Sequence, residues 1–278
     1  HDERIDTTCW WSDDGSTWSE QGHDEVLLRG ATIEGGTAND DAAVLWGRSH
    51  HGSRVWVSED GAAWQESALR GGVDLVAHLG DAFVAFGRGS NSRPTVAYST
   101  DGLSWDESRG DNPVVFEGAR MVVAVPFEGR FVAGGTDIMR GVAATWATDD
   151  GRRWHRTSLP STASTHLADL VVAGDRLLAV GVVRDAGRRA VEVWESNDAA
   201  SWKPVATPEL FADATAKAMQ MVGDSAVVCG TLYVERDDAR VESVPVTWRS
   251  RILDSSEPSA QEVADPQAVR EPEPVPAR

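Results

Sequence analysis

Cysteine, lysine and tyrosine are nearly missing from this chain, and long apolar runs are missing altogether. The two cysteines, Cys9 and Cys229, can form neither a disulfide framework nor a four-cysteine zinc site, which leaves one long-range disulfide open. No apolar run approaches the ~20 residues of a membrane-spanning helix. The net charge of −18 disfavours nucleic acid and anionic membranes as partners. The 278 residues suffice for one large or two small domains with a substantial core.

Tryptophan, by contrast, is in excess, and a repeated phrase accounts for it. The phrase is written first as S-D-D-G-S-T-W at 12–18 and returns four times. Its recurring residues are Asp14, Gly15 and Trp18; Asp60, Gly61 and Trp64; Asp101, Gly102 and Trp105; Asp150, Gly151 and Trp154; and, without the glycine, Asp198 and Trp202. A second tryptophan precedes most copies by two residues, and T-W-R-S at 247–250 keeps only this part. Ten of the twelve tryptophans fall in these two columns, so the excess belongs to the repeat.

A second recurring segment lies upstream of each phrase and ends in glycine. It reads G-D-A-F-V-A-F-G at 80–87, E-G-R-F-V-A-G-G at 128–135, G-D-R-L-L-A-V-G at 174–181 and G-D-S-A-V-V-C-G at 223–230, with a weaker copy at 40–47. Short Val-, Ala- and Phe-rich runs between Gly-Asp and Asp-Gly pairs predict strands joined by tight hairpins. Only 213–219 allows a helical turn. Four predicted strands per repeat of 41 to 49 residues indicate an all-β fold, a β-propeller of four-stranded antiparallel blades.

The order of the predicted strands favours six blades, the first of them incomplete in this chain. Lettered a to d within each repeat, the strands run c-d, then four full units, then a-b-c. Five or seven blades are the alternatives. In the five-bladed one, residues 8–20 pair with 216–231, which places Cys9 beside Cys229. We expect a lead-in at 1–7, the propeller at 8–253 and a disordered tail at 254–278, where five prolines and six acids stand with few large apolar groups. Because the first residue is His and no signal peptide is visible, we expect a processed chain or a fragment.

The phrase S/T-x-D-G-x-x-W resembles the Asp-box, or bacterial neuraminidase repeat, of sialidase-like β-propellers, in a variant whose serine stands one residue nearer the glycine. The resemblance implies that each box is a structural turn between the two outer strands, and the residues agree. An Asp before Gly can accept bonds from the N–H groups of its own turn, while Gly permits the bend and Trp packs between blades. Two or three oxygens per box are too few for calcium, and carboxylates on different blades cannot converge for catalysis. We therefore expect no metal and no cofactor.

A sialidase-type glycoside hydrolase is the alternative function. The resemblance implies an arginine triad, a Tyr–Glu nucleophile pair and an acid/base Asp for such an enzyme. No R-I-P motif is present, Arg93-Pro94 being the nearest remnant. Tyr98 is expected to pack beside its box, so Tyr233 is the one candidate nucleophile. Other catalytic motifs are missing, and the pair His50-His51 is expected in a solvated turn.

The loops between the predicted b and c strands all carry arginine, although the chain is acidic. The first four hold eight arginines and only two acids, Asp137 and Asp185. Arginine clusters bind carboxylate, sulfate and phosphate groups. The predicted ligand residues are Arg48, Arg54, Arg88, Arg93, Arg140, Arg184 and Arg188. Our main hypothesis is a non-catalytic binding or scaffold domain, extracytoplasmic and monomeric, whose loop face takes an anionic glycan or an acidic protein segment.

Overall fold

The computed structural model describes residues 9–12, 14–21, 28, 30–88, 94–107, 113–161, 163–205, 211–236 and 241–251. The predicted lead-in at 1–7 and the predicted tail at 254–278 lie outside these residues. Apart from the short 3₁₀ helix η2 (Pro113–Phe116), the regular structure of the described part is all strand. No helix in these ranges is long and apolar enough to cross a membrane.

The strands form six antiparallel sheets in the described residues, which we name blades 1 to 6. In chain order they contain β1 (Cys9–Trp11) and β2 (Ser19–Gln21); β3 (Thr32–Ala38), β4 (Ala43–Ser49), β5 (Gly52–Ser58) and β6 (Gln65–Glu66); β7 (Gly72–Leu79), β8 (Ala82–Arg88) and β9 (Pro94–Ser99); β10 (Ala119–Phe127), β11 (Arg130–Asp137), β12 (Val142–Thr148) and β13 (His155–Ser158); β14 (Ser164–Ala173), β15 (Arg176–Asp185), β16 (Arg188–Ser196) and β17 (Lys203–Val205); and β18 (Ala214–Val222), β19 (Ser225–Glu235) and β20 (Val241–Arg251). In blade 3 a single bridge between Tyr98 and Asp106 marks the fourth position.

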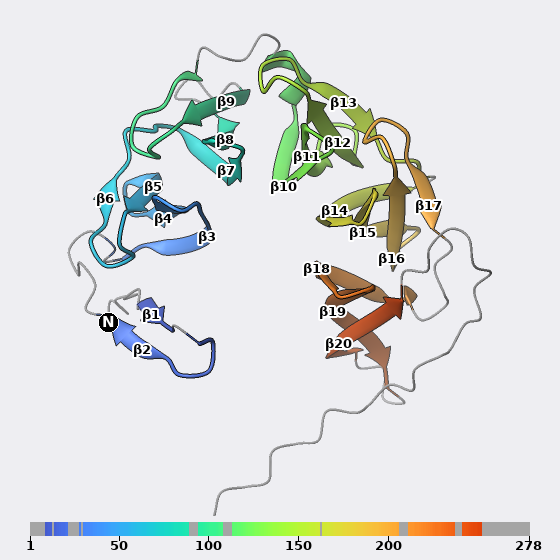
Figure 1. The fold of residues 1–278 in the computed structure, drawn as a ribbon. Helices are drawn as coiled ribbons and strands as arrows, with labels where there is room; N and C mark the ends of the chain where they lie inside the picture. The colour runs from blue at the N-terminus through green and yellow to red at the C-terminus, as the bar shows by residue number, and fades with distance from the viewer. Residues whose placement is uncertain are drawn as a thin grey trace, which may run out of the picture.

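The blades stand in an arc around a common centre, with the first strand of blades 2 to 6 innermost and β6, β13 and β17 on the outside (Figure 1). Each inner strand packs against the neighbouring blade, as β14 does against β10, β11 and β12. The all-β propeller prediction is confirmed, including a first blade that consists only of its two outer strands.

The five-bladed pairing of residues 8–20 with 216–231 is wrong. The edge of β19 is taken by β20 over its whole length, with Cys229 opposite Thr247. The strands β1 and β2 lie at the other end of the arc (Figure 1). Cys229 is accordingly a free, exposed cysteine, and the disulfide left open by the sequence is not formed. The predicted helical turn at 213–219 is also wrong, because these residues pair with β19 as strand β18 and sheet pairing outweighs the helix propensity of alanine.

The repeated phrase forms a turn that its own carboxylate holds. In every copy one Asp oxygen accepts the backbone N–H groups two and three residues ahead, as Asp60 does from Ala62 and Ala63, both at 2.8 Å. The preceding hydroxyl bonds the same carboxylate, as in Ser58 to Asp60 at 3.1 Å. The glycines adopt positive φ, and Ala199 takes the same conformation at 59°. Hydrogen bonds from the N–H groups of Ser201, which has the larger effect, and Ala200 lower the pKa of Asp198 to about 2, although burial acts to raise it. The ionised carboxylate is therefore held by its own turn.

The tryptophans of the repeat pack between blades wherever a preceding blade is present. Trp154 is 1% exposed and donates its indole N–H to the Tyr98 hydroxyl of the preceding blade at 3.1 Å. Trp105 donates in the same way to Ser67 Oγ at 2.7 Å. Trp18 is 58% exposed, so the prediction that it stacks blades is wrong for this copy. The described residues place no blade in front of blade 1, so nothing covers Trp18.

A β-bulge in every inner strand explains the glycine that ends the second recurring segment. The register between inner strand and second strand shifts at the same place in blades 2 to 6, which leaves one extra residue in the inner strand. The bulge turns the carbonyl two residues earlier toward the second strand. A Cβ on Gly87 would lie 2.0 Å from the Gly72 oxygen, and one on Gly135 would lie 2.2 Å from the Arg120 oxygen. No other residue fits there without moving the backbone.

Candidate ligand site at the inner rim

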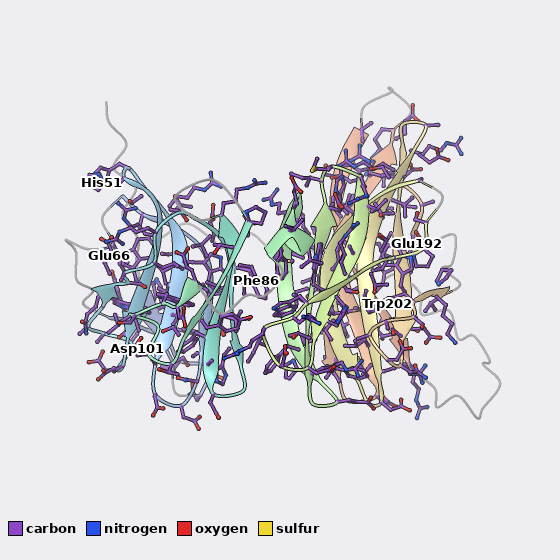
Figure 2. All side chains as sticks on the ribbon, turned by 90° about the horizontal axis from the view of Figure 1, so that it is seen from above. His51, Glu66, Phe86, Asp101, Glu192 and Trp202 are labelled. Atoms are coloured by element: carbon purple, nitrogen blue, oxygen red, sulfur yellow. The ribbon has the colours of Figure 1, made fainter. Side chains whose placement is uncertain are left out.

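The two ends of the strands carry different features. The loops between second and third strands lie at one end, and the box turns lie at the other, as His51 and Asp101 show in Figure 2. The beginnings of the inner strands share the end with the arginine loops, because Thr32 pairs with Arg48 and Gly72 with Arg88. We call this end of the inner strands the inner rim.

The bulged residues lie on the inner rim and differ from blade to blade. They are Glu34, Asp74, Val122, Ala168 and Lys217 in blades 2 to 6. All except Ala168, which is half-buried, are exposed. A bulged residue has no directly opposite residue on the neighbouring strand, so its side chain is not fixed by cross-strand pairing and is available to contact a ligand.

Charged side chains from three consecutive blades act electrostatically on Asp74. Glu34 forms an ion pair with Arg48, with Oε1 and Nε 2.8 Å apart. The strands around Asp74 partly shield its carboxyl from water, and this raises its pKa above 3.8. Arg120 and Arg88 act against this rise, Glu34 adds to it, and Arg48 opposes it again. We call Glu34, Arg48, Asp74, Arg88 and Arg120 the rim cluster.

Two of the arginines predicted as ligand residues belong to the rim cluster, Arg48 and Arg88. Arg184 and Arg188 are exposed on the β15–β16 hairpin of blade 5, away from the cluster. Arg93 lies outside the described residues.

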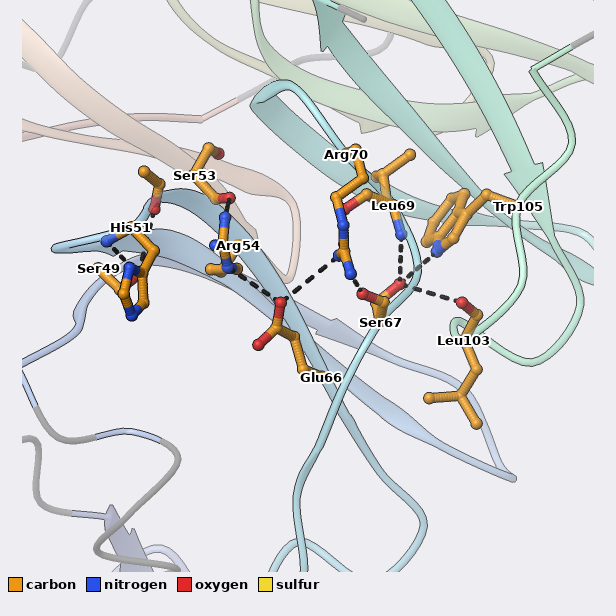
Figure 3. Close-up of polar contacts among 11 residues, drawn as sticks. Ser49, His51, Ser53, Arg54, Glu66, Ser67, Leu69, Arg70, Leu103 and Trp105 are labelled. Carbon is orange, nitrogen blue, oxygen red and sulfur yellow. Dashed lines mark hydrogen bonds and ion pairs between the residues drawn. The ribbon is translucent and has the colours of Figure 1, made fainter. Parts of the chain in front are cut away.

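Two other predicted ligand arginines form ion pairs within the fold. Arg54 binds Glu66 on the outermost strand at 3.0 Å, and Arg70 binds the same carboxylate (Figure 3). Arg140 binds Asp137 at 2.7 Å, and Arg156 binds the same carboxylate at 2.8 Å. Asp137 is fully buried, and although burial acts to raise its pKa, the bonds from Arg140 and the charge of Arg156 keep it below 3.8.

Neither tyrosine is placed as a nucleophile beside the rim cluster. Tyr98 is buried and bonded to Trp154, in keeping with a packing role. Tyr233 lies inside β19, opposite Ser243. The Arg189 guanidinium stands 4.1 Å over its ring, a cation–π contact in blades 5 and 6.

The described residues contain no group of three or more His, Cys, Asp or Glu side chains that could hold a metal. The rings of His50 and His51 contact each other in an exposed turn, with centroids 3.8 Å apart and planes tilted by 45°. The cavity between blades 2 and 3, lined by Leu69, Val73 and Phe86 among others, has room for about one water molecule.

Three members of the rim cluster were missed from the sequence: Glu34, Asp74 and Arg120. An alignment of the inner strands with one another would have identified them. When the repeats are aligned on the glycine that ends each second strand, Glu34 and Asp74 occupy the same position, and Arg120 stands two residues before that position. Only the bulge shows that this position faces the rim.

The fold and the rim cluster define a β-propeller with a polar inner rim, and comparisons with known proteins add little to this. No family model and no curated protein matches the chain. Solved structures with a similar strand arrangement include a thermostable family-43 glycoside hydrolase (10% identity over 86% of this chain and 96% of that one, TM-score 0.41). Others are the β-1,2-mannobiose phosphorylase from Listeria innocua (11%, 80% and 91%, 0.43) and an endo-arabinase from Bacteroides thetaiotaomicron (11%, 82% and 95%, 0.41).

Proposed function

We propose that this chain is a β-propeller binding domain that takes an anionic ligand at its inner rim. The observation that supports this is the rim cluster itself, in which arginines from blades 2, 3 and 4 act electrostatically on one carboxylate. Arg48 is paired with Glu34, whereas Arg88 and Arg120 are exposed, form no ion pair with another described residue, and act on the partly shielded Asp74. A planar guanidinium binds a carboxylate, sulfate or phosphate through two parallel hydrogen bonds, so two such groups form a suitable anion site.

The test is binding of heparin, a sulfated polysaccharide, to the intact chain and to the double variant Arg88→Ala, Arg120→Ala. Each lost charged hydrogen bond costs about 1.5–3 kcal/mol, so affinity should fall by at least about tenfold. The matched control is Arg152→Ala, Arg153→Ala, on the opposite face. These two residues serve Asp150 only through backbone N–H groups, which alanine keeps. No heparin binding by the parent chain, or equal loss in both double variants, would refute the proposal.

A glycoside hydrolase is the second candidate, and one observation favours it. Asp74 and Glu34 are close enough to affect each other electrostatically: burial raises the pKa of Asp74, Glu34 adds to that rise, and Glu34 itself forms an ion pair with Arg48. A pair of carboxylates supplies the acid and the base of such enzymes. An exo-sialidase would also need Tyr233, which belongs to blade 6.

Chromogenic aryl glycosides, including an aryl sialoside, test this candidate. Hydrolysis by the parent chain that is lost in both Asp74→Asn and Glu34→Gln, but not in Arg152→Ala, is expected of an enzyme. If the parent hydrolyses none of them, or if both variants remain active, Asp74 and Glu34 are not its catalytic pair.

We propose in addition that the chain is a member of the Asp-box propellers and acts as a monomer outside the cytoplasm. The bonded turns of the repeat support the first part. Sedimentation analysis of the intact chain tests whether it is monomeric.

A further inference from the structure

Exposed apolar side chains occur on blade 4 and on the 3₁₀ helix η2 that precedes it. Val114, Val122, Ile138 and Met139 are 75%, 41%, 53% and 72% exposed, and we call them the blade-4 patch. Five other large apolar residues are exposed in the described ranges. Trp10 and Trp18 belong to blade 1, and Val172, Val222 and Val241 lie singly on three different strands. Single exposed apolar residues are ordinary, but a group of them marks an interaction surface.

The loop that carries Ile138 and Met139 is held rigidly. The N–H groups of Met139 and Arg140 both bond Asp137 Oδ1 at 3.0 Å, and that carboxylate is buried. The Ile138 N–H bonds the Gly118 carbonyl at 2.9 Å, which ties the loop to the segment that follows η2. Gly118 has a φ of 73°, and a Cβ there would lie 2.6 Å from Met139 Cγ. A fixed apolar loop loses little conformational entropy when it binds a partner.

The patch lies beside the rim cluster. Val122 is the bulged residue of β10, and Arg120 precedes it by two residues on the same exposed side of the strand. Arg140 follows Met139 directly and is largely exposed although it contacts Asp137. Glu117 is the exposed acid of the neighbouring turn. Apolar groups and guanidinium groups therefore stand side by side over the inner end of blade 4.

We propose that the blade-4 patch and the rim arginines together bind an acidic protein segment that carries apolar side chains. The proposal rests on the proposed function, since Arg88 and Arg120 supply its anion contacts, and it specifies the partner. An anionic glycan satisfies arginines but has few apolar groups to cover Ile138 and Met139. A peptide that alternates acidic and apolar residues satisfies both, and buried apolar anchors with a charged rim are typical of protein interfaces.

Fluorescence anisotropy on the full chain with two synthetic probes tests the proposal. One peptide alternates Asp or Glu with Leu, and the other has Ser in place of every Leu. The Leu peptide should bind at least about tenfold more tightly, as expected for a buried apolar anchor. The variant Ile138→Ser, Met139→Ser should lose this advantage and keep its affinity for heparin.

The matched control is Val172→Ser, Val222→Ser, which changes exposed valines at the other end of the strands and should keep the preference for Leu. Circular dichroism shows that each variant is folded, and Met139→Leu, which stays apolar, should also keep the preference. Equal binding of the two peptides, or a preference that survives Ile138→Ser, Met139→Ser, overturns the proposal and leaves the anion site standing if heparin still binds. Binding of no probe by the parent chain refutes the proposed function and this inference together.

Discussion

Trp154 and Trp18 hold the same position of the repeat, and replacing each by alanine should have very different consequences. Trp154 is 1% exposed, and its ring meets Phe86 and Phe116 edge to face with centroids 5.4 and 5.7 Å away. Its loss leaves a cavity and removes the bond to the Tyr98 hydroxyl, which together should lower the free energy of unfolding by about 3–5 kcal/mol. Trp18 is 58% exposed, so Trp18→Ala should stay within about 0.5 kcal/mol of the parent.

Urea unfolding followed by circular dichroism measures both effects, because tryptophan fluorescence would itself change with the substitution. Tyr98→Phe is a finer control: it keeps the ring, removes the hydroxyl that accepts the 3.1 Å bond from the Trp154 indole, and should cost about 1 kcal/mol. If Trp18→Ala lowers the free energy of unfolding as much as Trp154→Ala does, then Trp18 is buried in solution and its exposure in this structure is wrong. If Trp154→Ala keeps the parent midpoint, the inter-blade tryptophan does not stabilise the propeller.

Two further predictions concern the inner strands. Gly87→Ala should lower the free energy of unfolding by about 1–3 kcal/mol, because its Cβ would lie 2.0 Å from the Gly72 carbonyl oxygen. Gly72→Ala is the control and should be nearly neutral in the same urea assay, because a Cβ there meets nothing within 4 Å. Equal effects of the two substitutions would contradict the bulge geometry. The raised pKa of Asp74 means that the folded chain holds this proton more tightly than the unfolded chain, so stability is lost as pH rises from about 3.8 through the folded-state value. Asp74→Asn should therefore raise the melting temperature at neutral pH, with the gain vanishing below about pH 3.8, and a lower melting temperature at neutral pH would show that the arginines outweigh burial.

The blades could be predicted because their signals are local. Asp-Gly pairs, hydroxyls and short β-branched runs act within a few residues, and their bonds close inside one turn, as Asp60 does with Ala62 and Ala63. Six copies of the third strand then fixed the order of the sheets. The exposure of Trp18 could not be predicted in the same way, since it depends on whether another blade stands in front of the first.

The partners of the loop arginines could not be predicted from the sequence. Arg54 and Arg140 come from the predicted arginine-bearing loops, as Arg48 does, but their charges are paired with Glu66 and Asp137 inside their own blades. Glu66 lies on the outermost strand, and Asp137 is turned inward by its own loop, so the composition of the arginine loops did not predict these ion pairs. Arg120 was overlooked because it precedes the short apolar run of β10. Its place beside Asp74 follows from the packing of β10 against β7, a contact between blades.

The bulge of the inner strands separates what is constant in the repeat from what can vary. Opposite the bulge the glycine is required in every blade from 2 to 6, since the carbonyl of the inner strand fills the space of a side chain. The bulged residue itself has no ladder partner, and it is acidic in blades 2 and 3, valine in blade 4 and lysine in blade 6. Five structurally equivalent positions thus present different chemistry to one centre without disturbing any sheet. The neighbouring acidic and apolar positions of blades 3 and 4, each flanked by an arginine, are the reason to expect a ligand that combines negative charge with apolar groups.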